Sequence, residues 1–370
     1  MPATIVIDNG ADSIKLGFSG SLCPLTQVPT IVGTPRSTYD LVMPSQHKSY
    51  YIGHDAQEKR GILSLRSPIV RGTMTNWDDM ERIWRYILYD QLKVNPEDHP
   101  ILLTEAVLSP TKQREKSTEI MFETFNTPAV FIQTQASLCL YASGRSTGLV
   151  VDIGHDATYA VPIINGRSNR FSMNRADIGG RHLTEYLGKL LADRGHFCQG
   201  QSGETTLRGI KEKLCFVSQD FDSSLLAPVC KEYQDTDGNV IELGQERFKC
   251  PEAFFNPPIA NLQSPGVHEL VHASIKASPA SIHKDLYNNV VLAGGTSLIR
   301  GIEERLEQEL KILDPQSTPT IISLPYRQNM AWIGGSILGS LDNFEKDYAI
   351  SKNEYAEQGP AIVHRFNHVV

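Results

Sequence analysis

Two apolar runs in this chain each end in an aspartate that a glycine follows two residues later, a pattern suited to binding phosphate and a cation. The runs are residues 5–10 (IVIDNG) and 149–154 (LVVDIG). Glycine at the end of a strand lets backbone N–H groups approach phosphate oxygens. Asp8 and Asp152 could hold Mg²⁺, mostly through water, because Mg²⁺ dehydrates reluctantly. Lys15, seven residues after Asp8, could reach a phosphate as a point charge.

A third run, residues 289–295 (NVVLAGG), ends in a glycine turn and leads into an expected helix. Ile302, Leu306, Leu310 and Leu313 recur there at helical spacing, with charged residues between them. The β-branched residues of all three runs predict buried strands that stop at tight turns. Two unrelated core strands with ordinary turns are the alternative for the first two runs, and hydrophobic periodicity alone does not separate these hypotheses.

The elements that must position these residues are a mixture of strands and helices. Helices are expected over residues 110–125 and around the apolar positions from Leu183 to Leu191, with Gly195 as a terminator. Strands and helices mixed in this way indicate an α/β protein. Because the first two runs are so similar, we expect a duplicated domain with a cleft between its halves.

Composition limits the classes of function. The chain has 370 residues, 40% of them hydrophobic, and a net charge of −7. This composition supports a large folded core, and the negative charge makes nucleic acid or an anionic membrane an unlikely main partner. The six cysteines include no CxxC pair, so we expect free thiols in a reducing compartment. We expect no signal peptide, no membrane-spanning segment and no direct membrane contact.

Longer stretches of the chain resemble the actin family. The resemblance runs from residue 5 to about residue 365 with few changes in length. It is carried by LLTEA (102–106), REK (114–116), IMFETFN (120–126), YASGR (141–145), IKEKLC (210–215), WIGGS (332–336) and GPAIVHR (359–365).

The resemblance implies a duplicated α/β fold of the actin, Hsp70 and sugar-kinase type, with two lobes around a nucleotide cleft. Residues 1–142 plus 330–370 would form the first half, with an outer lobe at about 30–67. Residues 143–329 would form the second half, with an outer lobe at about 179–264. ATP or ADP, with Mg²⁺ (or Ca²⁺), would occupy the cleft.

The resemblance also implies roles for individual residues. Asp8 and Asp152 would hold the cation through water, and Gln135 would help place the attacking water, a task of positioning and electrostatics in phosphoryl transfer. Lys211 and Glu212 lie on an expected helix, for which a solvated face is the alternative. The residues implied to contact the nucleotide are Asp8, Gly10, Ala11, Asp12, Ser13, Lys15, Gly154, His155, Asp156, Ala157, Gly180, Arg208, Lys211, Glu212, Gly294, Gly295, Thr296, Leu298, Ile299 and Gln328.

Several of these positions depart from the family pattern. Ala11 and Asp12 replace a serine and a glycine, which removes a hydroxyl donor and adds a carboxylate near the phosphates. His155 replaces the metal-side aspartate, and Asp156 beside it is a carboxylate displaced by one position. Tyr159 replaces a histidine near the attacking water, and a phenol with a pKa near 10 accepts a proton poorly at neutral pH. These changes predict slow or absent ATP hydrolysis.

Three further positions depart from the family pattern, two of them on the adenine side. Gln328 replaces a lysine, Ile299 replaces a tyrosine, and Arg71 replaces the histidine that actin methylates. They predict an altered affinity for nucleotide.

The surfaces that would meet partners also differ. Residues 1–4 carry no acidic side chain, and residues 21–22 (SL) replace an acidic pair, so we expect weak binding to myosin. The loop 37–48 and the apolar stretch 257–262 correspond to filament contacts, the latter as an exposed plug, with a loop folded onto its own domain as the alternative. The expected partners are other actin-like subunits, either copies of itself or members of a multi-protein complex. The expected location is the cytoplasm and cytoskeleton, with the nucleus as an alternative.

Two other functions stay open. One is an ATP phosphotransferase of the sugar-kinase type, which shares the fold. The other is a conventional ATP-hydrolysing actin.

Overall fold

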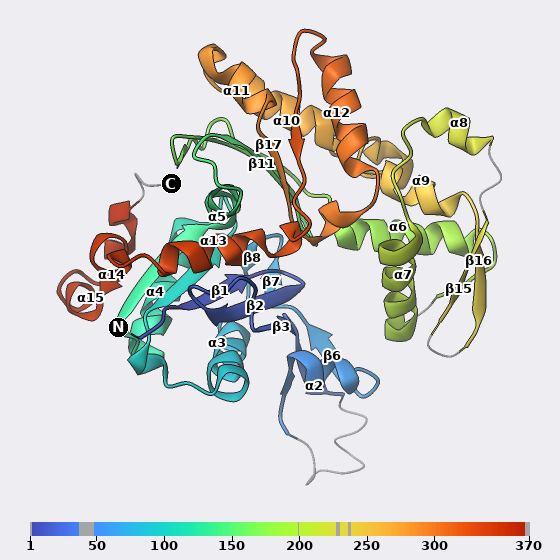
Figure 1. Ribbon diagram of the computed structural model, residues 1–370. Coiled ribbons are helices and arrows are strands. Elements are labelled where there is room, and N and C mark those ends of the chain that lie inside the picture. The colour runs from blue at the N-terminus through green and yellow to red at the C-terminus, as the bar shows by residue number, and fades with distance from the viewer. Residues whose placement is uncertain (1, 37–47, 199, 227–229, 236–237, 367–370) are drawn as a thin grey trace. The chain divides into compact units, whose positions relative to one another are not determined.

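The computed structural model describes residues 2–36, 48–198, 200–226, 230–235 and 238–366 (Figure 1). The chain divides into two compact units. Unit 1 comprises Met1–Ser146, Ile164–Ser168 and Asn329–Val370, and unit 2 comprises Thr147–Ile163 and Asn169–Gln328. Both units combine sheets and helices, so the predicted α/β class is confirmed.

Unit 1 is built on a six-stranded sheet in the order β19-β10-β9-β1-β2-β3. β1 is parallel to β9, β9 is parallel to β10, and β1 forms an antiparallel hairpin with β2. The three parallel strands therefore end at the same edge. The strands are β1 (Ile5–Asn9), β2 (Ser13–Phe18), β3 (Thr26–Pro29), β9 (Ile101–Glu105), β10 (Ala129–Thr134) and β19 (Ile350–Ser351).

The central strand of unit 1 is buried on both faces. Ile5 and Ile7 pack into a cluster that contains Trp84, whereas Val6 packs into the opposite cluster, which contains Trp332. Successive side chains of a strand point to opposite faces, so a run of consecutive apolar residues is what a doubly covered strand requires.

Helices cover both faces of this sheet. On the Val6 face, α5 and α13 approach so closely that a Cβ on Gly334 would lie 1.9 Å from the carbonyl oxygen of Leu138. The predicted helix over residues 110–125 is present as α4 followed by a π-helical segment, η3. The helices are α3 (Trp77–Arg85), η1 (Tyr86–Leu92), η2 (Pro96–Asp98), α4 (Thr111–Glu119), η3 (Ile120–Thr124), α5 (Gln135–Ala142), α13 (Met330–Gly339), α14 (Phe344–Asp347), α15 (Lys352–Gln358) and η8 (Pro360–Phe366).

The remaining elements of unit 1 include a small sheet in the order β5-β4-β6 and a hairpin of β7 and β8. Most of the predicted filament-contact loop, residues 37–47, lies outside the described residues. These elements are β4 (Val32–Pro35), β5 (Tyr51–Ile52), α2 (Gly53–Glu58), β6 (Leu63–Arg66), β7 (Ile69–Val70), β8 (Thr73–Met74) and β13 (Arg167–Ser168).

Unit 2 contains a sheet in which β12, β11, β17 and β18 follow one another and β14 pairs with β12. β11 is parallel to β17 and forms an antiparallel hairpin with β12. The strands are β11 (Gly148–Ile153), β12 (Thr158–Ile164), β14 (Asn174–Ala176), β17 (Val290–Ala293) and β18 (Ile321–Ile322), with a separate hairpin of β15 (Lys231–Gln234) and β16 (Val240–Leu243).

One hydrophobic cluster unites this sheet with the helices of unit 2. The helices predicted around Leu183 and over Ile302 to Leu313 are present as α6 and α12. The helices are α6 (Gly180–Ala192), α7 (Gly200–Leu214), α8 (Phe221–Leu225), α9 (Glu246–Glu252), η4 (Pro257–Ala260), α10 (Val267–Lys276), η5 (Ala280–Ile282), α11 (His283–Tyr287), η6 (Gly295–Leu298) and α12 (Ile302–Leu313), and η7 (Arg327–Asn329) begins at the end of this unit.

The apolar stretch 257–262 is not an exposed plug. Pro257 and Ala260 are buried, and Ile259 and Leu262 pack against the core of unit 2. The alternative, a loop folded onto its own domain, describes this stretch better than an exposed plug, although Pro258 remains exposed.

The hairpins of the two units share one register. Asp8 lies opposite Lys15 on β1 and β2, and Asp152 lies opposite Tyr159 on β11 and β12. Each aspartate is the last residue but one of a strand whose other neighbour is parallel to it. The same local arrangement therefore presents a carboxylate and a loop in each unit.

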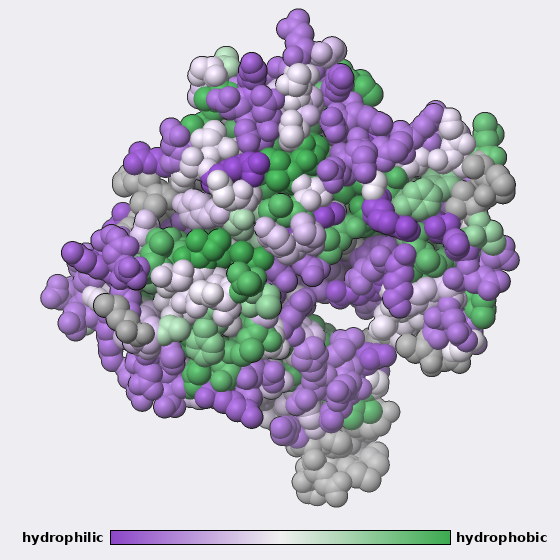
Figure 2. Space-filling view, viewed as in Figure 1, coloured by the Kyte–Doolittle hydropathy of each residue, from purple (hydrophilic) through white to green (hydrophobic). Residues whose placement is uncertain are grey.

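The surface carries few large apolar side chains. Figure 2 shows a mostly hydrophilic face with separate hydrophobic patches. Among the described residues, Leu22, Phe171 and Leu226 are the most exposed of these side chains. Within the described ranges, no cysteine forms a disulfide, and no helix is long and apolar enough to cross a membrane.

Candidate functional site

Asp8 lies at the edge of unit 1 where β1, β9 and β10 end, and it is 2% exposed. Thr104, near the end of β9, donates its hydroxyl to Asp8 Oδ1 at 2.7 Å. Gln135, the first residue of α5, donates Nε2 to the same oxygen at 2.9 Å. Lys15 Nζ, from the opposite strand of the hairpin, lies 3.1 Å from Asp8 Oδ2. Three further elements thus hold this carboxylate.

These contacts keep Asp8 ionised. Burial alone would raise the pKa of its carboxyl group. The Lys15 ammonium and the hydrogen bonds from Thr104 and Gln135 outweigh burial, so the pKa of Asp8 lies below its ordinary value. The group is therefore a fixed negative charge at neutral pH, as a cation site requires.

The first loop, residues 10–13, is held in place by its carbonyl groups. Thr30 donates its hydroxyl to Gly10 O at 2.7 Å and its backbone N–H to Asp12 O at 3.0 Å. Gln27 donates Nε2 to Ser13 Oγ at 2.7 Å. Within the described parts of the chain, the N–H groups of Gly10 and Ala11 donate no hydrogen bond. The loop is thus anchored through its acceptors, and these two donors are left for a ligand.

Gln135 has one free acceptor. Its Nε2 is bound to Asp8 and lies 3.3 Å from Asn9 O. Its Oε1 accepts no hydrogen bond from any residue that the structure describes. A carbonyl oxygen held beside an ionised carboxylate can orient a water molecule, which fits the role implied for Gln135.

The second loop, residues 154–157, is tied to the first turn of α6 and to η6 in unit 2. Gly154 O accepts hydrogen bonds from Gly180 N at 3.0 Å and from Thr296 Oγ1 at 2.8 Å. His155 O accepts from Arg181 N at 2.9 Å. The N–H of Ala157 donates no hydrogen bond within the described ranges. This loop therefore repeats the design of the first, with anchored carbonyls and a free donor.

Asp156 has a protein counter-charge. Arg181 Nε lies 2.9 Å from Asp156 Oδ1, and Arg181 Nη1 lies 2.9 Å from Glu185 on the next turn of α6. His155 Nε2 is 3.9 Å from the same Asp156 oxygen. The carboxylate predicted to stand in for the metal-side aspartate is thus engaged by a guanidinium, which weakens its attraction for a cation.

Tyr159 lies opposite Asp152 in the hairpin and is buried. Burial raises the pKa of its hydroxyl to about 12, and the Arg175 guanidinium over its ring offsets this only in part. The hydroxyl keeps its proton throughout the neutral range. Tyr159 therefore cannot accept a proton from water there, which agrees with the prediction from the sequence.

Lys211 is not on a solvated helix face. It is 6% exposed, and its Nζ donates to Gly180 O at 2.8 Å and to Thr184 Oγ1 at 2.9 Å. Lys211 therefore holds α7 against the first turn of α6. Arg208 and Glu212, by contrast, pair with each other at 2.8 Å on an exposed face of α7.

Gly294 follows β17 and lies against Asp152. Its φ of +84° belongs to the left-handed region, and a Cβ there would lie 2.4 Å from Asp152 Oδ1. A Cβ on Gly180 would lie 2.7 Å from Thr296 Oγ1. At these two positions neighbouring atoms lie too close for a side chain, so glycine is required. A Cβ on Gly295, by contrast, would meet no atom within 4 Å.

The remaining predicted residues of unit 2 differ in exposure. Leu298 is partly exposed and Gln328 is exposed, so both are accessible from solvent. Ile299 is buried in the hydrophobic core. Its side chain therefore packs into the core of unit 2 at the end of the loop that begins at Gly294.

The residues present fit a nucleotide with a divalent cation. Glycines keep space beside Asp152 and Thr296 that a side chain would fill, and both loops offer free N–H donors. Within the described ranges, no group of three His, Cys, Asp or Glu side chains gathers into a metal site. A cation that keeps several waters needs no such group.

Three contributing residues were not found from the sequence. Thr104 reaches Asp8 across 96 positions of the chain, and Arg181 reaches Asp156 across 25. Arg327 bonds Ser297 across 30 positions. For Thr104, the sequence shows only that the apolar run 101–105 ends in polar residues. That pattern marks the end of a strand but does not predict the contact with Asp8.

Comparison with known proteins identifies the family. A protein family model described as Actin matches residues 2–367. This match spans the two units described above and nearly the whole chain of 370 residues. The chain therefore belongs to the actin family.

Proposed function

We propose that this actin-family protein binds ATP or ADP together with Mg²⁺ (or Ca²⁺) and hydrolyses ATP slowly or not at all. The observation that carries the proposal is the pair of loops, 10–13 and 154–157. Each follows an aspartate near a strand end and offers an N–H donor that bonds none of the described residues, while its carbonyls are bound elsewhere. Backbone donors of this kind suit phosphate oxygens.

The residues would divide the work as follows. Asp8 and Asp152 would hold the cation through water, and the cation would supply charge neutralisation for the phosphates. Lys15 adds positive charge beside Asp8. Gln135 would orient a water through its free Oε1. Tyr159 keeps its proton, so no side chain at that position accepts one from the water.

Phosphate release from purified, ATP-loaded protein tests this proposal. We expect bound nucleotide and a release rate far below that of conventional actin under the same conditions. A rate equal to that of conventional actin would contradict slow hydrolysis. A phosphorylated small-molecule product would instead support the sugar-kinase alternative.

We further propose that the protein acts as a subunit of an actin-like filament or of a multi-protein complex in the cytoplasm or nucleus. Family membership supports this role. Sedimentation with and without conventional actin separates a self-polymerising protein from a dedicated complex subunit. A monomer that associates with no actin-like partner would contradict it.

Binding to conventional myosin should be weak. Leu22 is 91% exposed and uncharged where an acidic pair was expected. Co-sedimentation with myosin at low salt should show much weaker binding than conventional actin. The difference should shrink as salt rises, because the missing contribution is electrostatic. Equal binding at low salt would contradict this expectation.

A further inference from the structure

We propose that Arg327 is a positioning residue that fixes the loop from Gly294 to Ile299 against Asp152 and the second phosphate loop, so that nucleotide retention depends on it. The inference rests on the proposed nucleotide function. It concerns a residue that makes none of the nucleotide contacts expected above. All the contacts that support it lie within unit 2.

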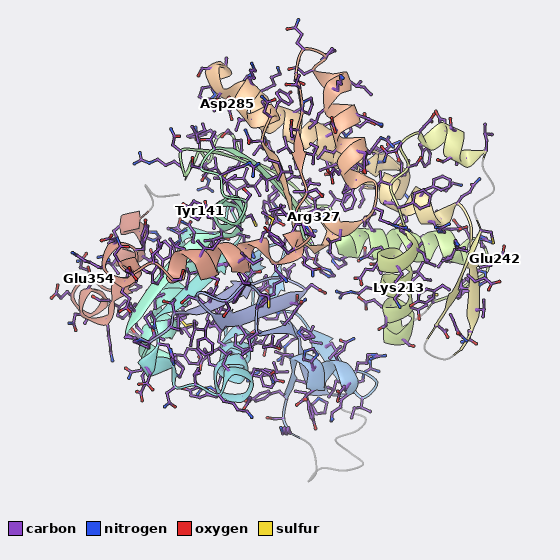
Figure 3. The ribbon with its side chains drawn as sticks, in the orientation of Figure 1. Tyr141, Lys213, Glu242, Asp285, Arg327 and Glu354 are labelled. Atoms are coloured by element: carbon purple, nitrogen blue, oxygen red, sulfur yellow. The ribbon has the colours of Figure 1, made fainter. Side chains whose placement is uncertain are left out.

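The guanidinium of Arg327 forms hydrogen bonds with Ser297, in the middle of this loop. Its Nε lies 3.2 Å from Ser297 Oγ and 3.3 Å from Ser297 O, and its Nη2 donates to Ser297 O at 3.1 Å. Nη1 donates to Leu324 O at 3.1 Å. Ser297 is fully buried, so this fork of donors is the loop's internal anchor. Figure 3 labels Arg327 at this position.

The backbone of Arg327 holds the start of the same loop. Arg327 O accepts a hydrogen bond from Gly294 N at 3.2 Å. Ser297 Oγ in turn donates to Gly294 O at 2.7 Å. Arg327 thus forms hydrogen bonds with both Gly294 and Ser297. The N–H and the carbonyl of Gly294, whose φ is positive, are both hydrogen-bonded.

The loop transmits this position to the phosphate side. Gly294 is so close to Asp152 that a Cβ would lie 2.4 Å from its carboxylate. Thr296 donates Oγ1 to Gly154 O at 2.8 Å. A shift of the loop would therefore move Gly294 relative to Asp152. It would also break the hydrogen bond from Thr296 that holds Gly154 in the second phosphate loop.

The charge of Arg327 is not neutralised by an ion pair. Among the residues that the structure describes, no carboxylate lies within ion-pair distance of it, and its bonded acceptors are all neutral oxygens. Burial lowers its pKa, and Glu303 opposes this. A guanidinium that forms no ion pair with a described carboxylate adds positive potential beside this loop, which favours an anionic ligand. A polyphosphate is such a ligand.

The test measures the dissociation rate of a fluorescent ATP analogue from Arg327→Ala, with Arg300→Ala as the matched control. Arg300 is exposed just beyond the same loop, so its variant loses the same side chain and the same charge. We expect Arg327→Ala to release the analogue about tenfold faster, the effect of losing roughly one charge-assisted hydrogen bond. We expect Arg300→Ala to match the wild type.

Two more variants separate positioning from a general loss of stability. Arg327→Lys keeps the charge without the fork and should fall between Arg327→Ala and the wild type. Ser297→Ala removes one acceptor of the fork and should also speed release, even if Arg327→Ala does not fold. Without nucleotide, the melting temperatures of these variants should fall by less than a general loss of stability would require to explain their faster release of the analogue.

The outcomes are distinct. Equal release from the wild type, Arg327→Lys and Ser297→Ala would overturn the role of Arg327 and leave the nucleotide function intact. A wild-type protein that binds no analogue would overturn the proposed nucleotide function itself.

Discussion

At the scale of single residues, the proposed slow hydrolysis depends on the protonation state of Tyr159. Burial raises its pKa to about 12, so the hydroxyl offers no base at neutral pH. Tyr159→His should raise the rate of phosphate release by roughly tenfold or more, because imidazole accepts protons near neutrality. The measurement is single-turnover release from ATP-loaded protein.

Tyr159→Phe is the matched control for that experiment. It removes a hydroxyl that never ionises in the neutral range, so the release rate should not change. A large loss of activity in Tyr159→Phe would show that the hydroxyl takes part in the reaction.

Asp8 should make stability depend on pH. Its pKa is lower in the folded protein than in the unfolded chain. The stabilisation it gives is therefore complete above the unfolded value of about 3.9 and is lost as the pH falls through the lower folded value. Asp8→Asn should cost about 2 kcal/mol of unfolding free energy at pH 7 without nucleotide, because it removes the buried ion pair between Asp8 and Lys15.

Chemical denaturation between pH 3 and pH 7 measures this effect. The difference in unfolding free energy between the wild type and Asp8→Asn should become smaller as the pH falls toward 3. Asp90→Asn, at an exposed position on η1, should follow the wild-type curve. A constant difference across the pH range would contradict an ionised, paired Asp8.

At the scale of elements, strand ends and glycine turns place the site. Gly294→Ala should destabilise the protein by roughly 2–4 kcal/mol, because the new Cβ meets Asp152 and the backbone has a positive φ. Gly295→Ala is the control, since a Cβ there meets nothing within 4 Å. Urea denaturation of both variants measures the contrast. Equal midpoints would show that the loop relaxes around the methyl group.

The sequence was most informative about these elements. Apolar runs ending in Asp8, Asp152 and Gly294 predicted strands and turns that the structure contains. Helical spacing likewise predicted α12. Local patterns suffice here because the apolar residues, aspartates and glycines that mark each element are near neighbours in the sequence.

The partners of the site residues could not be predicted in the same way. Arg181 beside Asp156 and the burial of Lys211 depend on how α6 and α7 pack in unit 2. The packing of Ile259 into the core also depends on tertiary structure, so an apolar loop was mistaken for an exposed one. These contacts join residues that are distant in sequence and carry no periodic signal.

At the scale of the whole molecule, the strand and loop occur twice, and we propose that both loops bind phosphate. Their chemistry differs. Unit 1 places a lysine opposite its aspartate, and unit 2 places a buried tyrosine there. The proposed retention of nucleotide and the proposed slow hydrolysis are compatible in one chain, because binding would use backbone donors and hydrolysis would require an additional proton acceptor.

We propose that the protein holds ATP and leaves it largely unhydrolysed. Chromatographic analysis of the nucleotide extracted from ATP-loaded protein, after removal of free ATP and a long incubation, measures this directly. We expect about one nucleotide per chain, mostly still ATP. Protein that retains only ADP, after the time in which conventional actin completes hydrolysis, would contradict it, as would protein that retains no nucleotide.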